Sequence, residues 1–209
     1  NKYTIKGNLV AVITDGSAVL GLGNVGPLAA KPVMEGKAVL FKRFAGIDVF
    51  NIELDTQDVD EIVNTIKNIA PTFGGINLED ISAPRCFEIE KRLIDELDIP
   101  VFHDDQHGTA IIVAAGLLNA LEIQEKNFKE AKIVCAGAGS AGIATLNLLL
   151  ELGFSKDNIL LVDRNGVVST KSENLSKEKL AFAADTDKKT LSDAIDGADV
   201  FIGVARGNL

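Results

Sequence analysis

Short apolar runs and amphipathic stretches alternate along this chain, and each predicts a strand or a helix. Apolar runs of strand length lie at 8–14, 38–41, 47–52, 73–78, 99–102, 132–136, 159–162 and 200–204. Helical spacing or helix-end signals mark 27–35, 58–70, 84–97, 107–121, 143–152 and 191–195. Strands that alternate with helices predict an α/β fold whose sheets contain parallel strands.

Two of the predicted helices carry signals that fix their expected places. Pro32 interrupts the helix at 27–35 and Gly36 ends it, so Lys37 is expected just beyond that helix and before a strand. The helix at 107–121 is too apolar for a surface position, so we expect it at the centre of the fold.

The stretch 73–108 contains two acidic pairs, each placed where a predicted strand ends. Glu79 and Asp80 follow the first strand, and Asp104 and Asp105 follow the second. The helix between the strands makes a βαβ unit, so the strands run parallel and their carboxyl ends share one edge of the sheet. Neighbouring strands lie about 4.8 Å apart, so the four carboxylates are expected to converge on one crevice.

Carboxylates that close together repel one another unless a proton or a cation lies between them. Ligands that are all oxygen favour a hard divalent cation, Mg²⁺ or Mn²⁺, over zinc. Each acidic pair alone is also typical of a helix N-terminus, where it would carry no ligand. His103 and His107 flank the second pair as zinc ligands would, but the turn between them breaks helical spacing. The combined pattern favours a Mg²⁺ or Mn²⁺ site.

A second motif begins where the predicted strand at 132–136 ends. It is G-x-G-x-x-G, formed by Gly137, Ala138, Gly139, Ser140, Ala141 and Gly142. The glycines permit a tight turn and let the backbone approach a pyrophosphate at the helix N-terminus. Asp163 ends the next strand about 20 residues further on, where an acid can bind a ribose 2′-hydroxyl. Asp163 favours NAD, whereas Arg164 beside it could meet the 2′-phosphate of NADP, so both cofactors stay open.

Composition narrows the class of protein. Of the 209 residues, 46% are hydrophobic, which is enough for a sizeable core in one large or two small domains. The formal net charge of −9 argues against nucleic acid as a partner. The 2 cysteines make no disulfide framework and no signal peptide is visible, so we expect a cytoplasmic protein. Its most apolar run is too short for a bilayer, so no membrane contact is expected.

The polar segment 124–130 reads as a linker between two domains. Residues 1–125 are expected to form an α/β domain with parallel strands that bear the metal site. Residues 126–209 are expected to form a Rossmann-type dinucleotide-binding domain, which is incomplete because such domains usually have about six strands. The only methionine is Met34, so Asn1 is not expected to be a translation start.

Long motifs follow one another in order along the chain. They are TDGSAVLGLGNVG at 14–26, EGKAVLFKRFAGID at 35–48, TFGGINLEDISAPRCFEIE at 72–90, FHDDQHGTA at 102–110 and GAGSAGIA at 137–144. Over nearly the whole chain this series resembles the malic enzymes in their shorter prokaryotic form. The resemblance implies oxidative decarboxylation of malate to pyruvate and CO₂, with NAD or NADP and Mg²⁺ or Mn²⁺, and it suggests a homodimer.

Residue by residue, the resemblance also implies roles within the site. The metal ligands would be Glu79, Asp80 and Asp105. Asp104 would be a neighbouring acid that does not bind the metal directly. Lys37 matches the family's general base, although from the residues alone it would be a surface lysine after a helix. A lysine works as a base only if burial or a neighbouring cation lowers its pKa.

The chain departs from the family's pattern where the substrate is handled. The general-acid tyrosine of the family would lie before residue 1, and Tyr3 does not match it. Ala18 stands where the larger malic enzymes have a substrate-binding arginine. The asparagine-bearing loops that close over the substrate would lie beyond Leu209, so the chain is expected to be truncated at both ends.

Two other classes of function stay open. A malolactic enzyme has a similar sequence, converts malate to lactate and keeps its NAD bound. A non-catalytic nucleotide-binding fragment could keep the fold without the chemistry. Loss of the acidic cluster would be expected of such a protein, and this sequence retains the cluster.

Overall fold

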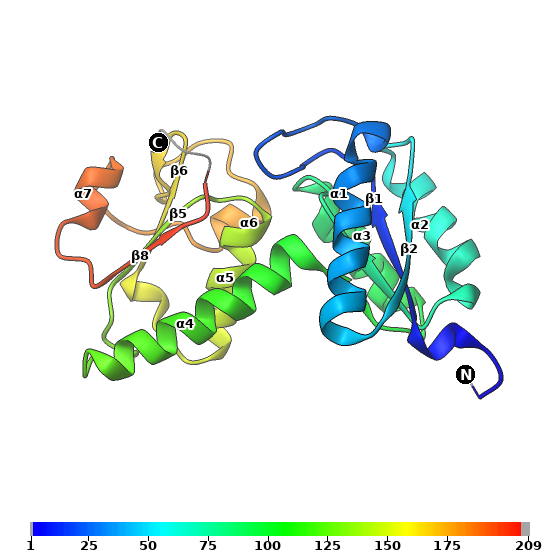
Figure 1. Cartoon of the computed structure of the whole chain (residues 1–209). Coiled ribbons are helices and arrows are strands. Elements are labelled where there is room, and N and C mark those ends of the chain that lie inside the picture. Colours follow the sequence, from blue (N-terminus) through cyan, green and yellow to red (C-terminus); the bar gives the residue numbers. More distant parts are fainter. Residues whose placement is uncertain (1, 206–209) are drawn as a thin grey trace. The chain divides into compact units, whose positions relative to one another are not determined.

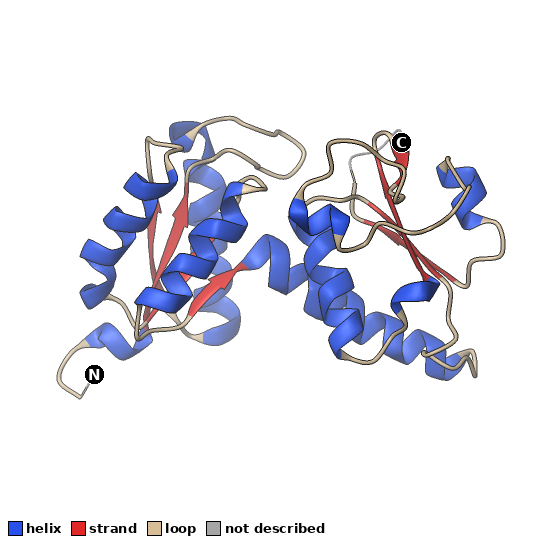
Figure 2. Cartoon of the chain, turned by 180° about the vertical axis from the view of Figure 1, so that it is seen from behind, coloured by secondary structure: helices blue, strands red, loops and turns tan. Residues whose placement is uncertain are grey.

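The computed structural model describes residues 2–205 and divides the chain into two compact units, Asn1–Asp105 and Gln106–Leu209 (Figure 1). Each unit contains a four-stranded sheet with helices packed against it (Figure 2). The predicted fold class, an α/β domain with parallel strands followed by a Rossmann-type domain, is therefore confirmed. Within the described residues, no helix has the length and apolar character needed to cross a bilayer.

The first unit alternates strands and helices along the chain. They are β1 (Leu9–Thr14), α1 (Pro27–Leu40), β2 (Asp48–Glu53), α2 (Val59–Ile69), β3 (Gly75–Leu78), α3 (Arg85–Glu96) and β4 (Val101–His103). The sheet order is β2-β1-β3-β4 and all neighbours are parallel. In this register Leu78 lies beside both Ile13 and His103. The segments that follow β1, β3 and β4 therefore leave the sheet at the same edge.

Alternation along β1 decides which helices cover which face of this sheet. Ile13 lies in a buried cluster with Ile66 of α2 and Ile89 of α3. Val12 points to the opposite face, where α1 packs with Met34 fully buried. Helices on both faces leave the carboxyl edge of the strands as the open side of the unit, which is where open α/β sheets bind ligands.

The strand expected at 38–41 is wrong, because a helix runs through that segment. α1 extends over Pro27–Leu40 and is followed by a π-helical turn, Phe41–Ala45. Pro32 lies inside the helix, and Gly36 has helical neighbours on both sides. A short apolar run cannot be told from part of a helix by composition alone, and here the helical period continues through it.

Burial along α1 shows why the sequence pattern misleads. Ala30 and Met34, one turn apart, are the buried residues of the helix. Val39 and Leu40 are exposed, so the apolar run near the end of the helix does not belong to the core of this unit. Lys37 consequently lies in the last turn of α1, and not beyond the end of the helix as expected.

The second unit has a sheet with one antiparallel edge. Its elements are α4 (Thr109–Ile123), β5 (Ile133–Ala136), α5 (Ser140–Glu151), β6 (Ile159–Asp163), β7 (Gly166–Val167), α6 (Lys177–Leu180), α7 (Leu191–Ile195) and β8 (Val200–Gly203). The order is β7-β6-β5-β8, and β5 is parallel to both β6 and β8. β7 is a short antiparallel strand on β6. The strand, glycine turn and helix expected around 132–152 are thus present as β5, the connecting loop and α5.

The two units divide between Asp105 and Gln106, earlier than the boundary expected between residues 125 and 126. α4 accounts for the difference, because it packs against α5 and belongs to the second unit. One face of α4 is buried and consists of Ala110, Ala114, Leu117 and Leu121. Ile112 and Ile123 are exposed, so the expectation that this helix is central is wrong. Apolar residues lie on the exposed side of this helix as well as on the buried side, so the sequence pattern does not reveal which face is buried.

The two faces of α3 provide a matched test of the first core. Ile89 is 0% exposed, whereas Ile94 on the same helix is 52% exposed. We expect Ile89→Ala to lower the free energy of unfolding by about 2–5 kcal/mol, because a large buried aliphatic side chain is lost. Ile94→Ala should change it by less than about 1 kcal/mol. Urea unfolding followed by circular dichroism checks both, and equal effects would contradict the packing of α3.

Candidate functional site

The carboxylates at the carboxyl edge of the first sheet converge. One carboxylate oxygen from each of Glu79, Asp80 and Asp105 lies within 4.8 Å of the others. Glu79 and Asp80 are buried, and Asp105 is partly exposed. The structure thus brings together the three residues that the sequence suggests as metal ligands. A donor set made only of carboxylate oxygens fits Mg²⁺ or Mn²⁺.

Lys37 connects this cluster to Asp104, the fourth acid. Lys37 Nζ lies 3.0 Å from Glu79 Oε1 and 2.7 Å from Asp104 Oδ2. The other oxygen of Glu79 accepts a hydrogen bond of 2.9 Å from Asn77 Nδ2. Asn77 and Glu79 are two positions apart along the chain, so a polar residue with strand spacing was the signal in the sequence, and sequence reasoning missed it. Lys37 therefore brings a positive charge into direct contact with the acidic cluster.

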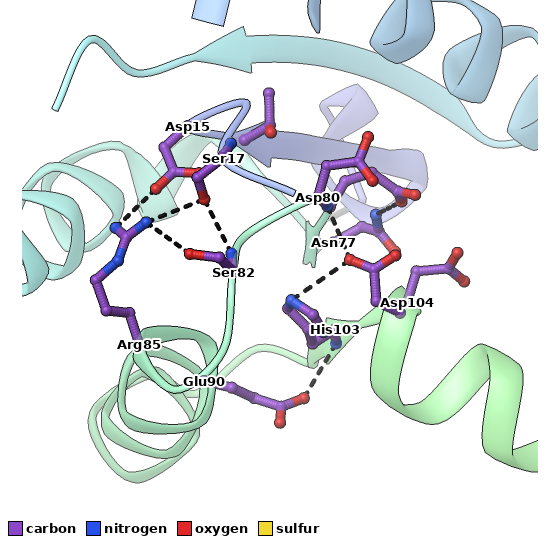
Figure 3. A network of polar contacts seen from close by, with 12 residues as sticks. Asp15, Ser17, Asn77, Asp80, Ser82, Arg85, Glu90, His103 and Asp104 are labelled. Atoms are coloured by element: carbon purple, nitrogen blue, oxygen red, sulfur yellow. Dashed lines mark hydrogen bonds and ion pairs between the residues drawn. The ribbon is translucent and has the colours of Figure 1, made fainter. Parts of the chain in front are cut away.

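The backbone at Asp80 has an uncommon conformation that neighbouring groups hold on both sides. Its φ is 54°, in the left-handed region that few non-glycine residues adopt. Asp80 N donates to Asp105 Oδ2 at 2.9 Å, and Asp80 O accepts from Ala18 N at 2.9 Å. His103 is buried nearby, with its Nε2 3.8 Å from Asp105 Oδ2, and its backbone N–H donates to Glu90 Oε1 at 3.0 Å (Figure 3). A left-handed residue fixed by its surroundings is typical of functional sites.

Burial of so many acids changes their protonation. Burial raises the pKa of Glu79 to about 7, partly opposed by Lys37. Burial also raises the pKa of Asp80 to about 6 and the pKa of Asp105 to about 6. Repulsion from Glu79 adds to the shift of Asp80, and repulsion from Asp80 adds to the shift of Asp105. For Lys37, burial favours the neutral amine, but contacts with Asp104 and Glu79 outweigh it and raise the pKa. The positive charge of Lys37 does not balance the negative charge of the clustered carboxylates, and such an excess of negative charge is expected of a cation site.

The glycine motif of the second unit has a different role for each glycine. Gly137 has a φ of +124°, and a Cβ there would lie 2.8 Å from the backbone of Val204. A Cβ on Gly142 would lie 1.8 Å from Gly137 O, so this glycine allows close packing of α5 on the loop. A Cβ on Gly139 would meet nothing within 4 Å. Gly139 is also the N-cap of α5, so the open space lies at a helix N-terminus, which is where dinucleotide-binding folds hold a pyrophosphate.

Asp163 ends β6, as the sequence predicts, and its carboxylate has partners within the unit. Asp163 Oδ2 lies 2.5 Å from Lys179 Nζ, and Oδ1 accepts from Asn165 N at 2.8 Å. Arg164 beside it is exposed. Sequence reasoning missed Lys179, because it lies in a polar stretch without periodicity. Of the other residues suggested for the cofactor, Ala138 lies on the loop after β5, and Ser140 and Ala141 lie at the start of α5.

Two charged residues near the acidic cluster were also missed. Arg85, at the start of α3, and Asp15, just after β1, form an ion pair of 2.8 Å, and Asp15 is buried. The sequence could have suggested Asp15, because it directly follows an apolar strand, as Glu79 does. No signal marks Arg85, since its position on a helix predicts only an exposed side chain.

Comparison with known proteins agrees with this architecture. The family described as "Malic enzyme, N-terminal domain" matches residues 1–94, and "Malic enzyme, NAD binding domain" matches residues 106–205. The NADP-dependent malic enzyme of Halomonas elongata is 59% identical over 97% of this chain and 48% of its own length. The NAD-dependent malic enzyme of Geobacillus stearothermophilus is 60% identical over 97% of this chain and 43% of its own.

Solved structures give the same result. The crystal structure of an NAD-dependent malic enzyme from Thermotoga maritima has a TM-score of 0.94 and 49% identity, covering 99% of this chain and 56% of that one. The malic enzyme from Pyrococcus horikoshii has a TM-score of 0.92 and 48% identity, covering 98% of this chain and 50% of that one.

Fold and site together define a two-unit α/β protein with an acidic cluster on the first sheet and a dinucleotide-type glycine loop on the second. The two matching family models, which together cover nearly all of its residues, identify the family. The chain belongs to the malic enzymes. It spans about half the length, or less, of the curated relatives described above.

The raised pKa values make a direct prediction for metal binding. Protons compete with a divalent cation for Glu79, Asp80 and Asp105, whose pKa values are raised to between about 6 and about 7. Lowering the pH through this range adds protons, so the affinity for Mn²⁺ should fall, by up to about tenfold per pH unit for each proton displaced. Titration of Mn²⁺ by electron paramagnetic resonance checks the slope.

A matched pair of variants assigns that slope to the cluster. Asp105→Asn keeps the shape but removes one charged ligand, so it should weaken Mn²⁺ binding and flatten the pH dependence. Asp95→Asn removes an exposed acid that pairs with Lys91 and should change neither. Unchanged Mn²⁺ affinity in Asp105→Asn would contradict the metal centre.

The glycine loop generates a prediction that separates binding from folding. A Cβ on Gly139 has open space in the protein, so Gly139→Ala should fold normally but intrude on a bound pyrophosphate. We expect the dissociation constant for NAD⁺ or NADP⁺ to rise about tenfold or more, measured by calorimetry. Gly116→Ala in α4 also adds a methyl group to open space and should leave cofactor binding unchanged. If both variants bind the cofactor equally well, the loop does not hold the pyrophosphate.

Proposed function

We propose that the protein catalyses oxidative decarboxylation of malate to pyruvate and CO₂, with NAD⁺ or NADP⁺ as oxidant and Mg²⁺ or Mn²⁺ as metal. The observation that carries the proposal is the convergence of Glu79, Asp80 and Asp105, with Lys37 in contact with the same cluster. The relatives described above are named NADP-dependent or NAD-dependent malic enzymes, which supports the same reaction for this chain.

In this proposal the three clustered carboxylates hold the divalent cation. When bound, the cation supplies Lewis-acid polarisation of the substrate's C2 oxygen. Glu79 keeps its orientation through the hydrogen bond from Asn77, and Asp80 through its two backbone hydrogen bonds. Carboxylates that are fixed before the cation arrives need little reorganisation when it binds.

Lys37 is proposed as the general base. Its ammonium is paired with Glu79 and Asp104, and these contacts raise its pKa. A cation held by Glu79 would take up one of the two counter-charges of Lys37 and place a positive charge nearby, and both effects would lower the pKa of Lys37. The neutral Nζ then accepts the proton of the C2 hydroxyl, while Asp104 Oδ2 holds the amine in place.

The cofactor is proposed to bind at the loop 137–142, with its pyrophosphate at the N-terminus of α5. Asp163 would accept hydrogen bonds from a free ribose 2′-hydroxyl, which favours NAD⁺. Lys179 offsets part of the charge of Asp163, and Arg164 is exposed beside it, so NADP⁺ remains an alternative. The homodimer and the cytoplasmic location suggested by the sequence remain predictions.

A malolactic reaction is the second candidate, because the same cluster and loop would serve it. Net reduction of the cofactor distinguishes the two reactions. The decisive experiment assays the intact protein for malate-dependent formation of NADH or NADPH, with Mn²⁺ and after its removal by a chelator. Metal-dependent formation of pyruvate with reduced cofactor supports the proposal. Lactate without net reduction supports the malolactic reaction, and no turnover with either cofactor contradicts both.

Replacement of the proposed base tests the mechanism. Lys37→Ala should lower kcat by about 10²–10⁴-fold, the range typical of lost general-base catalysis, with little effect on cofactor binding. Lys31→Ala removes another lysine of α1, which pairs with Glu53, and is expected to keep wild-type kcat. Steady-state kinetics with malate at saturation checks both. A Lys37→Ala protein that lost only cofactor affinity would exclude the lysine from the catalytic centre.

A further inference from the structure

A buried ion pair joins the segment after β1 to the start of α3. Asp15 has a side chain that is 0% exposed, and its Oδ2 accepts from Arg85 Nη1 at 2.8 Å. Its Oδ1 accepts from the hydroxyl of Ser17 at 2.5 Å. Arg85 Nη2 donates to the hydroxyls of Ser17 and Ser82, each at 3.0 Å. The guanidinium therefore links two loops that are far apart in the sequence (Figure 3).

The same two loops meet again at the peptide groups that follow Asp80. Ser82 N donates to Ser17 Oγ at 2.9 Å, and Ala18 N donates to Asp80 O at 2.9 Å. Asp80 itself adopts the left-handed φ of 54°. A residue in that conformation is retained only when its surroundings fix it. The hydrogen bonds from the segment 17–18 supply part of that constraint on the peptide groups next to the carboxylate.

We propose that Arg85 and Asp15 are positioning residues, which hold the segment 80–82 against the segment 15–18 and so orient the carboxylate of Asp80 toward a divalent cation. This inference rests on the metal centre proposed above. The planar guanidinium can bond a carboxylate and two hydroxyls at once, which a lysine ammonium on a flexible chain does not reproduce. Burial of Asp15 fixes the guanidinium, because a buried carboxylate is stable only with its partner in place.

The contacts of Arg85 favour positioning over direct binding of the substrate. Its charge is already paired with Asp15, and Nη1 also donates to Gln57 O at 2.8 Å. Only 22% of its side chain is exposed. An arginine that bound a malate carboxylate would have to give up some of these partners. The observed network instead uses the guanidinium to join backbone segments.

The test measures Mn²⁺ binding to the intact, metal-depleted protein by electron paramagnetic resonance, alongside NAD⁺ binding by calorimetry and thermal unfolding. Arg85→Lys keeps the charge but loses the fork of donors. Ser17→Ala removes one hydroxyl, which accepts from Ser82 N and Arg85 Nη2 and donates to Asp15, but it leaves the ion pair between Asp15 and Arg85 in place, so it should fold even if the arginine variant does not. We expect the dissociation constant for Mn²⁺ to rise about tenfold or more in both variants, as is typical when residues behind metal ligands are changed, with NAD⁺ binding unchanged.

Arg92→Lys is the matched control, because Arg92 lies on the same helix and pairs with Asp60 at 2.7 Å. It should leave Mn²⁺ binding as in the wild type. A purely structural role for Arg85 and Ser17 would lower the unfolding temperature without weakening Mn²⁺ binding to the folded protein, and that result overturns the proposal. A raised KM for malate with unchanged Mn²⁺ affinity also overturns it, in favour of substrate contact. If the wild type itself fails to bind Mn²⁺, the metal centre is at fault, which distinguishes the two failures.

Discussion

The repulsion among carboxylates at the carboxyl edge of the first sheet is the constraint on which the site depends. Parallel strands place their following residues at one edge, so Glu79 and Asp80 after β3 lie close to Asp105 after β4. In a buried position this arrangement is unfavourable unless protons or positive charge compensate for it. Burial is the main cause of the raised pKa values of the three acids, repulsion between carboxylates adds to it, and Lys37 supplies only part of the compensation.

Much of the surrounding structure serves to keep that unfavourable arrangement in place. Asn77 and Lys37 occupy the two oxygens of Glu79, and the backbone of Asp80 is held from both sides. Behind these contacts lies the core formed by β1, β3, α2 and α3, which fixes the ends of the strands. In the proposed metal centre, carboxylates that are fixed in this way bind a cation with little reorganisation, which would account for burying acids at a cost in stability.

The second unit has a different constraint, which is the close approach of backbone segments around its glycine loop. Gly137 and Gly142 are needed because other backbone atoms occupy the space of a side chain, whereas Gly139 leaves space that the protein does not fill. One unit thus offers oxygen ligands and a lysine, and the other offers a helix N-terminus and the acid Asp163. In the proposed reaction, the first set of groups would serve the metal and the substrate, and the second set would bind the cofactor.

The sequence by itself determined the α/β class, most strands and the acidic pairs at strand ends, because periodicity and position relative to a strand are local properties. It also determined the G-x-G-x-x-G turn before α5, since its glycines are adjacent in the chain. Only the tertiary structure decided that 38–41 is helical, that α4 belongs to the second unit, and that Lys37 meets Glu79 and Asp104. The contacts of Arg85 with Asp15 and Ser17 were likewise invisible, as they join segments about 70 residues apart. Such contacts depend on how strands are ordered in the sheet, and no local pattern of apolar and polar residues encodes that order.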